Sequence, residues 1–113
     1  MRTCVRVASK GSITGQLERA LAKRDVMAVR SLAGELPTVP LPLAAEITVL
    51  LLEQEPESYV PAARRLLARV AEERSMPLRQ LADVAAFLAE LEAHPAPRFA
   101  GKSLASMVED ATH

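Results

Sequence analysis

Eight prolines lie between residues 37 and 97, and they limit this chain to short regular elements. Proline lacks a backbone N–H group and disfavours helix in the residue before it, so helices end at prolines or begin just after them. Between these breaks the apolar residues recur every three or four positions, which is the period of an amphipathic helix. The pattern therefore predicts an all-α fold, a bundle of five to six helices built from antiparallel α-hairpins.

The helical pattern can be divided into segments with recognisable starts. Asp25 and Ser58 are candidate N-caps, because their side chains can accept a hydrogen bond from the first helical turn. A last, short helix is expected from Ser103, with a small apolar edge supplied by Leu104, Met107 and Val108. The expected ranges of the five main helices are about 12–24, 26–36, 43–54, 58–74 and 78–93.

We expect three parts in the chain: a flexible tail at 1–11, a helical bundle at 12–93 and a proline-marked segment at 94–113. At 113 residues the chain has the usual size of one domain. The segment 43–54 is apolar nearly all round, which is typical of a helix at the centre of a bundle. The central residues of the apolar stripes are expected to meet in one cluster: Ile47, Leu50, Leu51, Leu66, Val70, Leu81 and Leu88.

The cysteine content and the length of the apolar runs suggest a compartment. Cys4 is the single cysteine, and one thiol cannot form a disulfide framework. Unbroken apolar runs such as Val49 to Leu52 are far too short to span a bilayer, and residues 1–12 contain no apolar run of signal-peptide length. We therefore expect a cytoplasmic protein that makes no membrane contact.

Net charge is zero, but charge is unevenly distributed along the chain. Residues 1–36 sum to +4 and residues 37–57 to −4, while 58–79 sum to +3 and 80–95 to −3. Our interpretation is that successive elements neutralise each other when they pack. The alternative is a nucleic-acid-associated regulatory protein that uses basic residues of the first, second and fourth helices. Those residues are Arg19, Lys23, Arg24, Arg30, Arg64, Arg65 and Arg69.

Two short motifs resemble nucleotide-binding or DNA-binding elements, and each lacks the structural setting that its function needs. The run 96–103 ends in Gly-Lys-Ser like a phosphate-binding P-loop, but it follows a helix and few residues remain after it. The run 75–85 resembles the first helix of a helix-turn-helix domain. Its helical pattern continues without the tight turn that precedes a recognition helix, and acidic residues follow. We expect no nucleotide cofactor, and the sequence argues against nucleic acid as a partner.

Metal-binding and catalytic patterns were sought around the histidines and the cysteine. His94 lies beside a proline break and His113 at the C-terminus, and no cluster of Cys, Asp or Glu gives metal-ligand spacing around either histidine. Cys4 has no orienting base near it in the sequence. We therefore predict no metal, no cofactor, no catalytic residues and no enzymatic activity.

The runs Gln16–Asp25 and Glu35–Ala44, together with the heavy use of Ala, Leu and Arg, resemble small all-helical proteins of high-GC bacteria. The resemblance spans residues 16–74 and is carried by packing and turn residues. It implies a helical fold, and that group has no known activity that would extend to this chain.

The apolar content of the third and fifth expected helices suggests a function. These helices carry more apolar surface than one five-helix bundle easily hides, and exposed apolar faces commonly mark interaction sites. The sequence therefore favours a non-enzymatic helical protein-interaction or scaffold module. Its partner is either another protein or a second copy of the chain in a homodimer.

Overall fold

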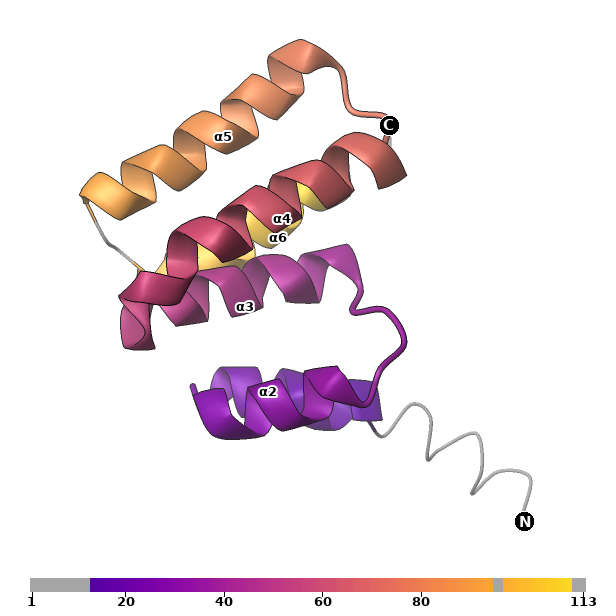
Figure 1. Cartoon of the computed structure of the whole chain (residues 1–113), viewed down its shortest axis with the longest axis vertical. Helices are drawn as coiled ribbons and strands as arrows, with labels where there is room; N and C mark the ends of the chain where they lie inside the picture. Colours follow the sequence, from indigo (N-terminus) through magenta and orange to yellow (C-terminus); the bar gives the residue numbers. More distant parts are fainter. Residues whose placement is uncertain (1–12, 95–96, 111–113) are drawn as a thin grey trace. The chain divides into compact units, whose positions relative to one another are not determined.

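The computed structural model describes residues 13–94 and 97–110, and every regular element among them is helical (Figure 1). The all-α fold class is therefore confirmed. The chain divides into two compact units, residues 1–39 and residues 40–113. The tail expected at 1–11 lies outside the described residues. Among the described residues, no helix is both long and apolar enough to cross a membrane.

The N-terminal unit contains a helix over residues 13–22 and α2 (Val26–Gly34), joined by a tight turn. Arg24 lies in the left-handed region with φ 58°. The backbone N–H groups of Arg24 and Asp25 donate to the carbonyl oxygens of Leu21 and Ala20, both at 3.0 Å, which is the hydrogen-bond pattern of a Schellman motif. Glycine usually occupies the left-handed position, so arginine costs about 1–2 kcal/mol there.

Asp25 begins α2 as the sequence predicts. Its Oδ1 accepts a hydrogen bond from the backbone N–H of Ala28 at 3.2 Å, which satisfies one of the unpaired donors in the first helical turn. The predicted turn and its cap are therefore confirmed, because both follow from local backbone chemistry.

The C-terminal unit is an up-down bundle of four helices in which successive helices run in opposite directions (Figure 1). The helix α3 packs mainly against α6 and also against α4, while α5 packs against α4 and α6. The helices α3 and α5 therefore lie on opposite corners of the unit. Their ranges are α3 Leu41–Gln54, α4 Tyr59–Glu73, α5 Leu78–Ala93 and α6 Pro97–Asp110, with a 3-10 turn η1 at Pro56–Ser58.

Two predicted helix starts and one predicted capping hydrogen bond were wrong. The helix α3 begins at Leu41, because Pro42 can occupy one of the first helical positions, where its missing N–H costs nothing. Ser58 makes no capping hydrogen bond, since the turn η1 leads directly into α4 with Ser58 already in a helical conformation. Ser103 is an exposed residue inside α6, and this helix begins at Pro97. Proline is favoured at the first helical position, so Pro97 marks the start of α6.

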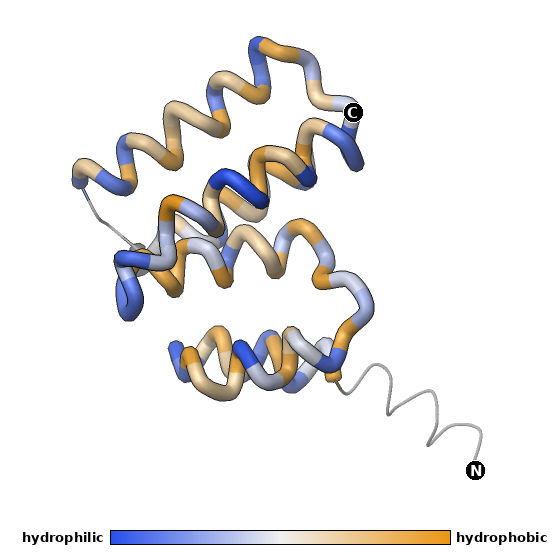
Figure 2. Tube along the Cα trace, viewed as in Figure 1, coloured by the Kyte–Doolittle hydropathy of each residue, from blue (hydrophilic) through white to orange (hydrophobic). Residues whose placement is uncertain are grey.

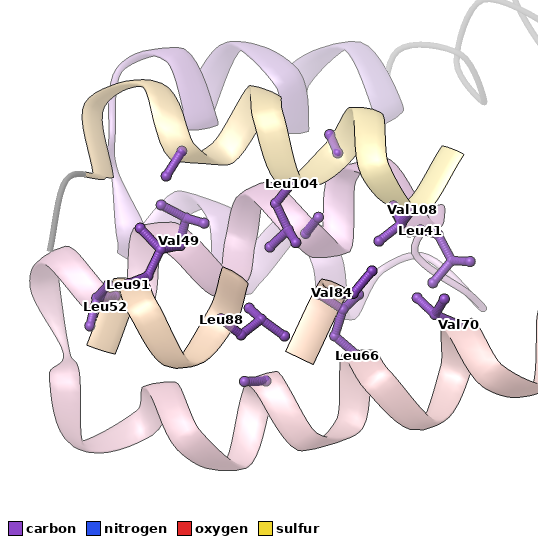
Figure 3. Close-up of a cluster of buried hydrophobic side chains, with 14 of the residues drawn as sticks. Leu41, Val49, Leu52, Leu66, Val70, Val84, Leu88, Leu91, Leu104 and Val108 are labelled. Atoms are coloured by element: carbon purple, nitrogen blue, oxygen red, sulfur yellow. The ribbon is translucent and has the colours of Figure 1, made fainter. Parts of the chain in front are cut away.

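The core of the C-terminal unit is a single cluster to which all four helices contribute (Figure 3). Leu104 of α6 is fully buried and points into the middle of this cluster. Around it lie Val49 from α3 and Leu88 from α5. The last helix, which was expected to be short and to carry only a small apolar edge, therefore supplies a central core residue.

The predicted core cluster was right for α4 and α5 and wrong for α3. Leu66, Val70 and Leu88 belong to the cluster, and Leu81 packs against it. The helix α3 contributes a different face, because it is apolar nearly all round and its periodicity does not show which stripe turns toward α4 and α6. Leu50 and Leu51 are buried without belonging to this cluster, Ile47 is half-buried, and the α3 members are instead Leu41, Ala45, Val49 and Leu52.

Truncation of Leu104 tests the role of α6. The change Leu104→Ala removes a fully enclosed side chain and should lower the free energy of unfolding by about 2–5 kcal/mol. The matched control Ser106→Ala lies on the exposed side of the same helix and should change it by at most about 0.5 kcal/mol. Urea unfolding followed by circular dichroism measures both. Equal small losses would show that α6 does not contribute to the core.

Candidate functional site

The seven basic residues of the nucleic-acid interpretation divide between the two units. Arg19, Lys23 and Arg30 are exposed in the N-terminal unit, where Arg24 is half-buried. The remaining three arginines lie on α4, where Arg64 and Arg65 are exposed and Arg69 is half-buried.

On α4, acidic side chains follow the arginines on the same side of the helix. Arg69 donates to both carboxylate oxygens of Glu73, from Nε at 2.7 Å and from a terminal nitrogen at 3.3 Å. This hydrogen bond from Arg69 is the main reason why the pKa of Glu73 is lowered. Glu72 lies one turn beyond Arg69 and also faces solvent. Arg69 is therefore engaged within its own helix, and the positive charge of α4 is partly neutralised.

The two motif-like runs adopt ordinary helical structure. Residues 97–103 form the first turns of α6, so their backbone does not form the loop that cradles phosphate in a P-loop. Lys102 instead lies 3.5 Å from a carboxylate oxygen of Glu46 on α3. The helix-turn-helix-like run continues as the single helix α5 to Ala93.

The titratable residues of the described part form no metal site. Across residues 13–94 and 97–110, no three His, Cys, Asp or Glu side chains lie close enough together to hold a metal ion. His94 is exposed, with Nε2 at 3.9 Å from a carboxylate oxygen of Glu90. Cys4 and His113 lie outside the described residues.

Tyr59 is a buried polar residue that links two helices. Its hydroxyl donates to the backbone carbonyl of Leu88 at 2.7 Å and so connects the start of α4 to the middle of α5. Burial, and secondly the negative charge of Glu92, raise the pKa of Tyr59 to about 12. The phenol therefore stays protonated at neutral pH and acts as a structural donor.

The outer face of α5 is apolar and exposed, and we define it as Leu78, Ala82, Ala86, Ala89 and Ala93. These residues recur every three or four positions, so they share one side of the helix. The buried residues Val84, Leu88 and Leu91 lie on the opposite side. Leu78 is 81% exposed and the four alanines are all exposed. In Figure 2 much of α5 has the orange shades of apolar residues, interrupted by a few blue positions.

The sequence predicts excess apolar surface on this helix without indicating which side stays exposed. Leu78 has the spacing of an inner residue, because it lies ten residues before the buried Leu88, but it is the first residue of the helix and remains exposed there. The alanines gave a usable signal, since four of them share one helical stripe. Alanine is common on both buried and exposed helix surfaces, so that signal alone did not identify an exposed face.

One flank of the outer face carries charge. Arg79, Asp83 and Glu90 are all exposed and lie on the same side of the alanines. Arg79 is in the first turn of α5 and Glu90 is near its end. The surface therefore has apolar residues at its centre and charged residues along one flank.

The single tyrosine allows a direct test of the α4–α5 link. Because the folded pKa of about 12 exceeds the ordinary value of 10.0, the unfolded chain loses this proton first. Protonated Tyr59 therefore adds roughly 2–3 kcal/mol to the free energy of unfolding. This contribution is complete below pH 10 and is lost as pH rises toward 12.

Ultraviolet absorbance of the tyrosinate reports this titration without interference from another tyrosine. Urea unfolding at several alkaline pH values measures the change in stability. The variant Tyr59→Phe should lack this part of the alkaline loss. A titration midpoint near 10 in the folded protein would contradict the buried hydrogen bond.

No protein-family model matches the chain, and no curated protein or solved structure shows significant similarity to it.

Proposed function

We propose that the chain is a non-enzymatic protein-interaction module that binds a protein partner along the outer face of α5. The observation that carries the proposal is the exposure of Leu78 at the end of an exposed alanine stripe. Burying such a face against apolar groups of a partner is favourable by roughly 25 cal/mol for each Å² of apolar surface removed from water. Alanine side chains also let a partner helix approach closely.

The charged flank supports a protein partner over nucleic acid. Arg79, Asp83 and Glu90 carry both signs, and the basic residues of α4 are accompanied by Glu72 and Glu73. Phosphate backbones favour surfaces of uniform positive charge. The proposal also places the protein in the cytoplasm, because a chain with a single cysteine suits a reducing compartment.

Site-specific photo-crosslinking in the native host tests the proposal. A photoreactive residue at Ala86, at the centre of the outer face, should capture a defined protein. The matched control carries the photoreactive residue at Ala68, an exposed alanine on α4, and should not capture that protein. The captured protein is then identified and its binding is measured with purified components.

The expected result is that Ala86→Glu weakens this binding at least about tenfold, which corresponds to about 1.4 kcal/mol, while Ala68→Glu leaves it unchanged. The proposal fails if position 86 captures no more than position 68, or if Ala86→Glu binds as tightly as the unaltered chain. A different result would favour nucleic acid as the partner: the unaltered chain retains labelled nucleic acid at low salt, and variants of the α4 arginines do not.

A further inference from the structure

We draw no further inference here: the strongest candidate, the exposed apolar face of α5, belongs to the site already described, and nothing in the structure shows which partner covers it.

Discussion

The packing of α6 against α3 is the contact on which the C-terminal unit depends. The helix α3 is apolar on almost every side, so it is stable only where other helices cover it. The helix α6 supplies most of that cover within the unit, and Leu104 occupies the centre of the shared core. Gly101 lies at this contact, where an added Cβ would meet the Glu46 side chain at 3.6 Å and its Cα atom at 3.7 Å, which are ordinary van der Waals distances.

The position of α5 follows from this arrangement. The helices α3 and α5 lie on opposite corners, so α5 gives one face to the bundle and leaves the other exposed. The hydroxyl of Tyr59 holds α5 through the carbonyl of Leu88, and this hydrogen bond fixes which face turns inward. The outer face is thus set by the packing of the inner face. This exposed surface has alanines at its centre and charges along one flank.

The sequence predicted most accurately those features that depend on local chemistry. Pro77 and the break after His94 delimit α5, and Asp25 caps α2, because proline and a capping carboxylate act on adjacent backbone groups. The side of α4 that packs into the core was also predictable, since Leu66 and Val70 lie on one side of the helix and charged residues lie on the other. In each of these cases a few neighbouring residues suffice to determine the structure.

Features that depend on neighbouring helices could not be predicted from periodicity. The stripe of α3 that enters the core is selected by α6, and Val49 and Leu50 are equally apolar. The start of α6 was not predicted, because Pro97 belongs to a proline-rich run that looks like a break between helices. Proline nevertheless suits the first position of a helix, where its missing N–H group costs nothing. The candidate site was missed for a related reason: alanine suits both buried and exposed positions, so only the packing of α5 identifies which alanines remain exposed.

Native-state hydrogen exchange of backbone amides measures the central claim most directly. If α6 and α3 form one cooperative core, the amides of Leu104 and Val108 should exchange only through global unfolding, with the same opening free energy as that of Val49. Exchange in α6 that is faster than in α3 by orders of magnitude would show that α6 opens independently. The core described for this unit would then be wrong.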